Sequence, residues 1–312
     1  MTKIAIVGAG LIGRAWAISF ARSGASVALW DIDANAPAAA LATIGEMLPE
    51  LKRYGLLDDE PEAVLARIHA VETLEAALDG AAHVQENSPE NLDVKRELFA
   101  KLDAIAAPET VLASSTSAIL PSAFSADLPG RARMLVAHPI NPPYLIPAVE
   151  IVPAPWTDAR AVERTTALLR RAGHSPIVMK REIDGFVVNR LQGALLEEAF
   201  RLVDRGLASA DDVDVALKDG LALRWSFMGP FETIDLNAPK GVRDYVARYQ
   251  SIYMDMFPPG RADWAGPVLE TIEASRRAKT PEADLGERQA WRDRRLMALL
   301  AHKRKAASEI GD

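Results

Sequence analysis

The first part of the chain alternates short apolar runs with stretches whose apolar residues recur at helical spacing. The amphipathic stretches predict helices over 11–22, about 35–54, 91–107 and about 158–172. Strands separated by helices of this length pair in parallel through right-handed crossovers, so the pattern predicts a doubly wound α/β domain with a parallel sheet. The apolar runs predict strands over 4–7, 27–30, 68–71, 84–85, 111–114, 134–138, 149–152 and 176–179.

The pattern changes after Asp184, because helical spacing dominates from Gly185 onward and no strand signal survives. Gly and Pro residues, such as Gly229-Pro230, break this part into helices. We therefore predict a sheet domain over 1–184 and a smaller all-α domain over 185–312.

Composition and charge narrow the class of protein. The chain has 312 residues, of which 49% are hydrophobic and 25% charged, as in an ordinary globular protein. The net charge of −7 is spread along the sequence and argues against nucleic acid as a partner. No stretch approaches the roughly 20 apolar residues of a membrane helix. The first strand-like run begins almost at once, leaving no room for a signal peptide, so we expect a cytoplasmic protein without a membrane partner.

The residue types that commonly act as nucleophiles or metal ligands are scarce. The chain has no cysteine, which excludes disulfides, thiol nucleophiles and thiolate metal sites. None of the five histidines shares a helical ligand spacing with another, so we predict no metal centre. The chemistry must come from histidine, carboxylates, hydroxyls or an organic cofactor.

A glycine-rich motif lies between the first predicted strand and helix, and it runs Gly8-Ala9-Gly10-Leu11-Ile12-Gly13. In such a motif the first glycine permits the tight turn, the second admits a pyrophosphate, and the third lets helix and strand pack closely. Amides at the helix N-terminus then hold the phosphates. The alternative is a turn that merely reverses the chain, but the strand–turn–helix context favours dinucleotide binding in a Rossmann-type domain.

Asp31 follows the second predicted strand and selects among dinucleotides. A carboxylate there can accept both adenosine ribose hydroxyls and would repel a 2′-phosphate, which favours NAD over NADP. A turn-forming aspartate is the alternative, although Asp33 suits that role better. FAD would use the same fold, but the second half is small and helical and has no flavin pattern.

His138 and Glu150 are the candidate catalytic pair. His138 ends a predicted strand, where an open α/β sheet lines its ligand cleft. By itself a histidine there is more often a structural residue. However, Glu150 lies inside the apolar run 148–152, where a carboxylate is costly unless it is paired. His138 is its economical partner, and the pair would be a dyad in which Glu150 fixes the tautomer and stabilises the imidazolium.

Two further polar positions could line the same cleft. Ser117 follows the fifth predicted strand, beside Thr116, and Asn189 lies near the start of the first helix after the boundary. Ser117 could instead cap a helix, and Asn189 could be a packing amide. The residues alone leave both alternatives open.

Several stretches resemble the L-3-hydroxyacyl-CoA dehydrogenase superfamily, and within it the lambda-crystallin / L-gulonate 3-dehydrogenase branch. They are spread over essentially the whole chain. The matching stretches are GAGLIGRAWA from residue 8, QENSPENLDVK from 85, SSTSAI from 114, AHPINPPYLIPAVEIVP from 137, DGFVVNRLQ from 184, LRWSFMGPFETIDLNAPKG from 223 and RQAWRDRRLM from 288.

The resemblance implies roles for individual residues. It makes His138 the catalytic base and Glu150 its orienting partner, and it makes Ser117 and Asn189 contacts to the substrate oxygen and the nicotinamide region. Further NAD-contacting positions match Glu90, Lys95 and Asn141.

The reading that follows is an NAD-dependent oxidation of a 3-hydroxy group on a small free acid by a homodimer. The helical domain would close the cleft and supply the dimer contact. Arg224, whose guanidinium can grip both oxygens of a carboxylate, is the candidate for holding the acid. A surface arginine stabilising a helix end is the alternative.

Other functions stay open. A 3-hydroxyacyl-CoA dehydrogenase would need cations for the CoA phosphates, and the helix after Asp31 offers only Lys52 and Arg53. A carnitine dehydrogenase or diketoreductase would share the dyad. A non-catalytic, crystallin-like NAD-binding protein is the alternative from a different class, against which the intact set of polar site residues argues.

Overall fold

The computed structural model describes residues 2–239, 241–256, 274, 278 and 281–311. By its internal contacts the chain divides into two units. Unit 1 comprises residues 1–189 and 293–301, and unit 2 comprises residues 190–292 and 302–312. No described helix is long and apolar enough to cross a membrane.

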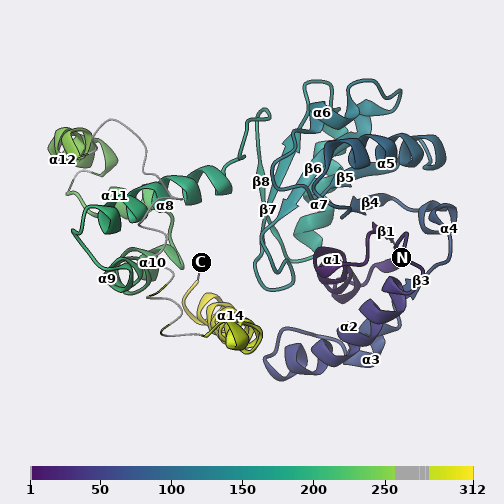
Figure 1. Ribbon diagram of the computed structural model, residues 1–312, viewed down its shortest axis with the longest axis horizontal. Coiled ribbons are helices and arrows are strands. Elements are labelled where there is room, and N and C mark those ends of the chain that lie inside the picture. The colour runs from purple at the N-terminus through teal and green to yellow at the C-terminus, as the bar shows by residue number, and fades with distance from the viewer. Residues whose placement is uncertain (1, 240, 257–273, 275–277, 279–280, 312) are drawn as a thin grey trace. The chain divides into compact units, whose positions relative to one another are not determined.

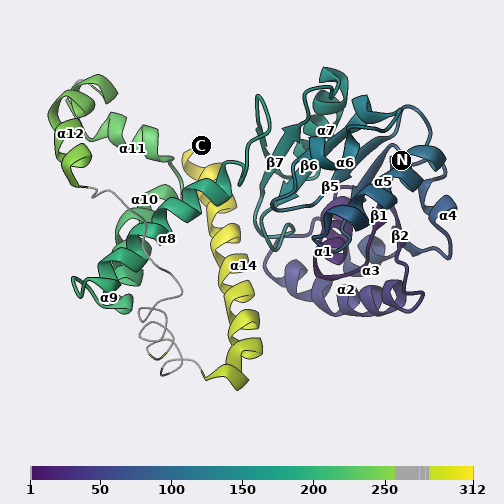
Figure 2. The ribbon, with the colours of Figure 1, turned by 45° about the horizontal axis from the view of Figure 1, so that its top comes forward.

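Unit 1 is built around one eight-stranded sheet with the order β3-β2-β1-β4-β5-β6-β7-β8 (Figures 1 and 2). The predicted doubly wound α/β fold is confirmed, with strand positions close to those expected. Its strands are β1 (Lys3–Val7), β2 (Ser26–Trp30), β3 (Ile68–Ala70), β4 (His83–Glu86), β5 (Val111–Ser114), β6 (Met134–Pro139), β7 (Ala148–Pro153) and β8 (Ser175–Val178).

Helices cover both faces of this sheet because successive strand residues point to opposite sides. Ile4 and Ile6 of β1 pack into one buried cluster with α1, α2 and α7, whereas Ala5 and Val7 pack into another with α4, α5 and α6. The helices of unit 1 are α1 (Leu11–Arg22), α2 (Ala36–Arg53), α3 (Pro61–Leu65), α4 (Leu74–Leu78), α5 (Leu92–Ile105), α6 (Pro121–Ser125), the 3₁₀ turn η1 (Arg131–Arg133) and α7 (Ala159–Arg171).

One pair of neighbouring strands departs from the predicted parallel pairing. β7 runs antiparallel to β6, whereas the other pairs in the sheet are parallel. The connection over 140–147 holds no helix, and it is shorter than the dozen or so residues that a parallel crossover needs. The chain therefore reverses directly and sets β7 beside β6.

The strand order also locates the ligand edge. β1 and β4 are neighbours, and the chain leaves β1 toward β2 but leaves β4 toward β5, in opposite directions across the sheet. In open α/β sheets ligands bind outside the carboxyl ends of the strands at such a reversal. The Gly8–Gly13 loop follows β1 at this edge.

The described part of unit 2 is helical. α8 (Val188–Asp204) begins in unit 1 and continues into unit 2, and a segment of α14 over 293–301 belongs to unit 1. The remaining elements are α9 (Ala210–Val215), the π-helical turn η2 (Ala216–Leu221), α10 (Ala222–Trp225), α11 (Pro230–Leu236), α12 (Val242–Met256), the 3₁₀ turn η3 (Glu282–Asp284) and α14 (Leu285–Ile310).

Candidate active site

The glycine-rich loop leaves open space where a phosphate group would have to lie. Gly8 has a φ of 97°, and a Cβ there would lie 2.8 Å from the carbonyl oxygen of Asn87. A Cβ on Gly13 would lie 1.8 Å from the Gly8 carbonyl oxygen, so this glycine brings helix and loop together. By contrast, a Cβ on Gly10 would meet nothing within 4 Å.

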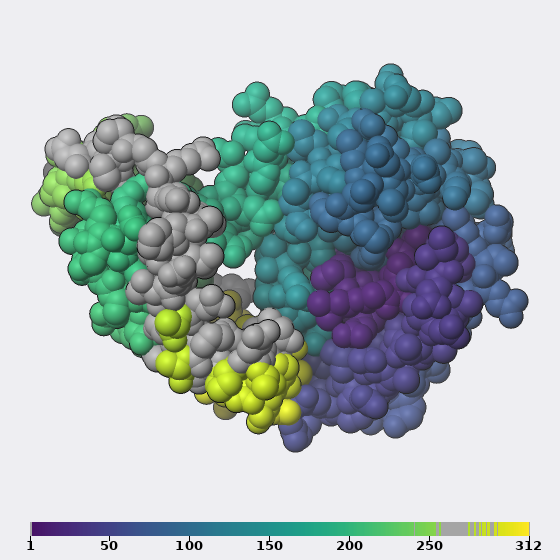
Figure 3. Space-filling view, viewed as in Figure 1, coloured from purple at the N-terminus to yellow at the C-terminus, as the bar shows by residue number. Residues whose placement is uncertain are grey.

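The N-terminus of α1 is suited to an anion. Gly10 occupies the position before the helix, and no side chain of the described residues caps the first turn or places a negative charge in it. Amides at a helix start attract anions. Gly10 and Leu11 are exposed, and the N-terminal segment, purple in Figure 3, reaches the surface of unit 1. The loop therefore fits a pyrophosphate.

Asp31 lies immediately after β2 and is bonded to this loop. Its Oδ2 accepts a hydrogen bond from the amide of Ala9 at 2.6 Å, and its Oδ1 accepts one from the amide of Asp33 at 2.9 Å. Each carboxylate oxygen can accept a further hydrogen bond. Asp33 makes a local turn of its own, accepting the Asn35 amide at 3.0 Å.

His138 and Glu150 form a buried hydrogen-bonded pair. They are register partners across β6 and β7, and His138 Nδ1 lies 2.7 Å from Glu150 Oε2. Glu150 is fully buried and His138 is 7% exposed. The ring of Phe186 packs 5.6 Å from the imidazole, centre to centre. The Nε2 atom of His138 has no hydrogen-bond partner among the described residues.

The second oxygen of Glu150 binds the start of a helix. Glu150 Oε1 accepts hydrogen bonds from the amides of Val187 at 2.7 Å and Val188 at 2.9 Å, where α8 begins. Phe186 just before them has a φ of 49°, a left-handed conformation that is unusual for a bulky residue. Its buried ring holds the turn that directs these amides at the carboxylate.

These contacts decide the charge of Glu150. Burial opposes its ionisation, but the hydrogen bonds from His138 and from the amides of Val188 and Val187 outweigh burial. The pKa of this carboxyl therefore lies below its ordinary value of 4.5. An ionised Glu150 accepts a hydrogen bond from the Nδ1–H group of His138, which leaves Nε2 unprotonated in the neutral ring.

Ser117 and Asn189 are brought together at the same edge. Asn189 Nδ2 donates to the backbone carbonyl of Ser117 at 2.8 Å. Ser117 is exposed and does not cap α6, whose preceding residue is Leu120. The contact connects the β5–α6 loop to the first turn of α8.

Comparison with known proteins identifies the chain's relatives. The model of the 3-hydroxyacyl-CoA dehydrogenase NAD binding domain matches residues 3–183, and that of the C-terminal domain matches 185–275. The chain belongs to the 3-hydroxyacyl-CoA dehydrogenase family. It is an NAD-dependent oxidoreductase acting on a hydroxyl group.

The relatives of this dehydrogenase refine the assignment. It is 44% identical to the lambda-crystallin homolog of Bos taurus, over 95% of this chain and 94% of that protein. It is 33% identical to the L-carnitine dehydrogenase of Pseudomonas aeruginosa, over 98% of this chain and 95% of that protein. The chain therefore falls in the lambda-crystallin branch of the superfamily.

A solved structure resembles the whole dehydrogenase chain. It is that of 5-formyl-3-hydroxy-2-methylpyridine 4-carboxylic acid 5-dehydrogenase, an NAD⁺-dependent dismutase. The TM-score is 0.81 at 29% sequence identity, and the match covers 97% of this chain and 98% of that one.

The other cofactor positions implied by the resemblance differ in accessibility. Glu90 Oε1 accepts hydrogen bonds from the Thr116 hydroxyl and, at 3.1 Å, from the amide of Ala118. Asn141, just beyond β6, is exposed. Lys95 is only 1% exposed, and its ammonium is bonded inside the protein. Their contacts with NAD remain predictions.

Arg224 lies in unit 2, on α10, and is exposed. Its charge lowers the pKa of Tyr245, although the hydrogen bond to Tyr253 dominates and leaves that pKa raised. Arg224 therefore lies within electrostatic range of Tyr245, which clusters with Tyr249 and Tyr253 on α12. Its role toward a substrate carboxylate remains a prediction.

The sequence reasoning missed Glu86, the last residue of β4, which is fully buried. The signal that singled out Glu150, a carboxylate inside a strand, was also present here. It was overlooked because the apolar run around 84–85 is short and Gln85 precedes the glutamate.

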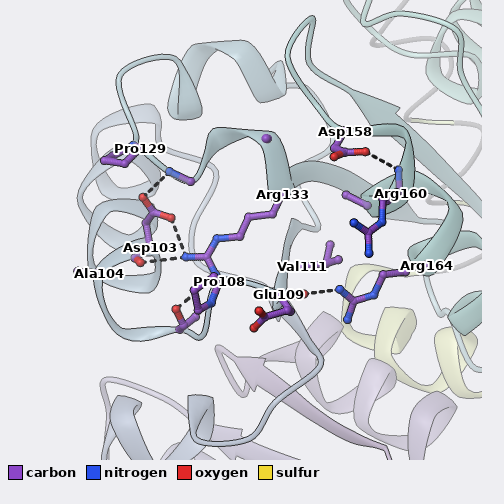
Figure 4. A pocket seen from close by; sticks show the side chains of 14 residues that line it. Asp103, Ala104, Pro108, Glu109, Val111, Pro129, Arg133, Asp158, Arg160 and Arg164 are labelled. Atoms are coloured by element: carbon purple, nitrogen blue, oxygen red, sulfur yellow. Dashed lines mark hydrogen bonds and ion pairs between the residues drawn. The ribbon is translucent and has the colours of Figure 1, made fainter.

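A cavity of about 690 Å³ lies away from these residues. Figure 4 shows its lining side chains, which include Arg133 just before β6 and Glu109 just before β5. It therefore opens at the amino ends of these strands, opposite the carboxyl end that carries His138. An ion pair between Arg133 and Asp103 at 2.8 Å holds its wall.

Proposed function

We propose that this enzyme oxidises the 3-hydroxyl of a small free hydroxy acid of L-gulonate size, with His138 as the general base. The single observation that supports it most is the hydrogen bond between Nδ1 of His138 and the buried carboxylate of Glu150. That bond leaves Nε2 as the proton-accepting atom at the ligand edge of the sheet.

Residues of the protein share the work of the proton transfer. The hydroxyl proton moves to His138 Nε2, and the negative charge of Glu150 stabilises the imidazolium that forms. Ser117 and Asn189 hold the substrate oxygen and keep it in line with Nε2. NAD, held by the Gly8–Gly13 loop and Asp31, would supply the hydride acceptor for the carbon that carries this hydroxyl. The products are the 3-keto acid, NADH and one proton.

The only two cations of the helix after Asp31 argue against a CoA thioester, because both are already paired. Lys52 pairs with Glu60 at 3.1 Å, and Arg53 pairs with Glu50 at 3.0 Å. CoA phosphates would have to displace these acidic partners before binding. A free acid makes no such demand, and Arg224 is our candidate for its carboxylate.

L-carnitine is the second candidate substrate, supported by the 33% identity to an L-carnitine dehydrogenase over almost the whole chain. It is also a free 3-hydroxy acid and would use the same dyad. Its quaternary ammonium separates it chemically from a sugar acid.

A substrate panel tests the proposal. L-gulonate, 3-hydroxybutyrate, L-carnitine and 3-hydroxybutyryl-CoA are each mixed with the purified enzyme and NAD, and NADH is followed by its absorbance. We expect the highest kcat/KM with L-gulonate. Turnover of the CoA thioester alone would contradict the substrate, and NADH binding without any turnover would support a crystallin-like protein.

We also propose a homodimer built on unit 2. Several large apolar side chains of its helices are exposed, and monomeric proteins rarely expose extended apolar patches. Light scattering on the purified chain should give twice the 33.8 kDa of one copy. Examples of these side chains are Leu191, Leu195, Leu223, Phe227, Phe231 and Ile252.

A further inference from the structure

A buried ion pair is bonded to the two loops that carry Glu90 and Ser117. Lys95 of α5 places its ammonium 3.0 Å from both carboxylate oxygens of Glu86, at the end of β4. Neither side chain reaches the surface, with exposures of 1% and 0%. The ammonium also donates to the carbonyl of Ser88 at 3.4 Å.

Glu86 holds the backbones of both loops. Its Oε1 accepts the amide of Ser88 at 2.5 Å, in the loop between β4 and α5. Its Oε2 accepts the hydroxyl of Ser114 at 2.5 Å, and the Ser114 hydroxyl accepts the amide of Thr116 at 3.2 Å. One carboxylate therefore sets the position of residue 88 and, through Ser114, of residue 116.

Glu90, in the β4–α5 loop, connects the same two loops by a second set of hydrogen bonds. It accepts the Thr116 hydroxyl and the Ala118 amide, which flank Ser117 on either side. The Ser117 carbonyl in turn accepts the amide of Asn189. Any shift of Ser88 or Thr116 therefore moves the residues proposed to contact the nicotinamide region.

A contribution to stability does not by itself explain why the protein contains a buried ion pair here. Removing two charges from water is costly, and apolar residues of similar volume often replace a buried ion pair at no loss of stability. A buried pair does, however, fix geometry, because its charges tolerate few arrangements. Here the arrangement that it fixes is that of the two loops.

We propose that Glu86 and Lys95 are positioning residues that set the β4–α5 and β5–α6 loops for the nicotinamide half of NAD. The adenosine diphosphate half depends instead on the Gly8–Gly13 loop and Asp31. Lys95 then acts on the loops through Glu86 and Ser88. This inference rests on the proposed role of Ser117, but it needs no knowledge of the substrate.

Binding measurements isolate the contribution of the nicotinamide ring. Affinities of the full chain for NADH and for ADP-ribose, which lacks the nicotinamide, are measured by calorimetry. We expect Lys95→Met to weaken the affinity for NADH by about tenfold or more, because the nicotinamide contacts are misplaced. The affinity for ADP-ribose should change by less than about twofold. Failure of the 3-hydroxy acid assignment would leave this result unaffected.

A second variant keeps the test valid if Lys95→Met, with its unpaired buried charge, fails to fold. The double variant Glu86→Gln with Lys95→Met carries no buried charge. We expect this variant to melt near the wild-type temperature. It should still bind NADH about tenfold more weakly than the wild type, with its affinity for ADP-ribose unchanged. A wild-type ratio of the two affinities in this folded variant would overturn the proposal.

A matched control breaks an ion pair at the opposite edge of the same sheet. Asp103→Asn removes the negative charge that pairs with Arg133, which lies beside Asp103 in Figure 4. We expect a lower melting temperature with the NADH to ADP-ribose ratio unchanged. If this control shifted the ratio equally, or if Lys95→Met weakened both ligands alike, the Glu86–Lys95 pair would be structural only.

Discussion

His138 and Glu150 face each other directly across the antiparallel strands β6 and β7, and the same carboxylate binds the first amides of α8. The histidine is thereby held by three elements at once. Because both carboxylate oxygens are engaged, the imidazole has one preferred tautomer and one preferred orientation.

His138→Ala should lower kcat by about 10²–10⁴-fold, the usual contribution of a general base. NADH affinity, measured by calorimetry, should stay near wild type because the glycine loop and Asp31 are untouched. A variant that kept more than about a third of its activity would exclude His138 as the base.

Glu150→Gln should reverse the tautomer of His138. The Gln oxygen can still accept the Val187 and Val188 amides, so its NH₂ must donate to Nδ1. The ring proton then moves to Nε2, which can no longer accept one. We expect kcat to fall by at least about 10²-fold, since a wrong tautomer costs about 10⁴ in a serine protease. The melting temperature checks that the fold persists, and unchanged kcat would contradict this tautomer assignment.

Asp31→Asn should narrow the preference for NAD over NADP. The amide removes the charge that repels a 2′-phosphate, while its oxygen can keep the hydrogen bond from Ala9. The ratio of kcat/KM for the two cofactors measures the effect, and we expect the gain to appear in NADP turnover. Asp33→Asn is the control and should leave the ratio unchanged. Equal use of both cofactors by the wild type would contradict the role of Asp31.

Arg224→Lys should raise the KM for L-gulonate by about tenfold with little effect on the KM for NAD. Lysine keeps the charge but loses the planar fork that binds both carboxylate oxygens. Steady-state kinetics with each ligand varied in turn measures the two values. An equal change in both would move Arg224 out of the substrate site.

Stability should fall as the pH is lowered from about 6.5 to 4 because of two buried histidines. Burial, against the raising hydrogen bond from Gln85 and with a smaller contribution from the charge of Arg164, lowers the pKa of His83 to about 4. Burial and then the Arg22 charge lower the pKa of His174 to about 4 as well. The unfolded chain takes up protons over this range while the folded one does not, so stability is complete above pH 6.5.

Urea unfolding between pH 7 and 4 measures this loss, which we expect to reach up to about 3 kcal/mol for each ring. His174→Phe is the informative variant, because its ring can keep the tilted contact with Trp16 and the buried Nε2 of His174 has no partner among the described residues. It should remove about half of the pH dependence. The same pH dependence in this variant as in the wild type would contradict the assignment to His174.

Much of this protein could be predicted from local patterns. The strand and helix positions of unit 1 follow from hydrophobic periodicity, which each segment carries by itself. The Gly8–Gly13 turn and Asp31 were recognisable because the chemistry of a phosphate turn lies within a few neighbouring residues. The cost of burying an unpaired carboxylate also pointed from Glu150 to His138 before any contact was known.

Tertiary structure alone decided what holds these residues in place. The antiparallel course of β7, the binding of the α8 amides by Glu150 and the Glu86–Lys95 pair join segments whose separation in the chain predicts nothing about their distance in space. A buried charge needs a partner, but any group of opposite charge at hydrogen-bond distance can offset the free-energy cost of burying it. Only the packing of the sheet and its helices selects which residue that is.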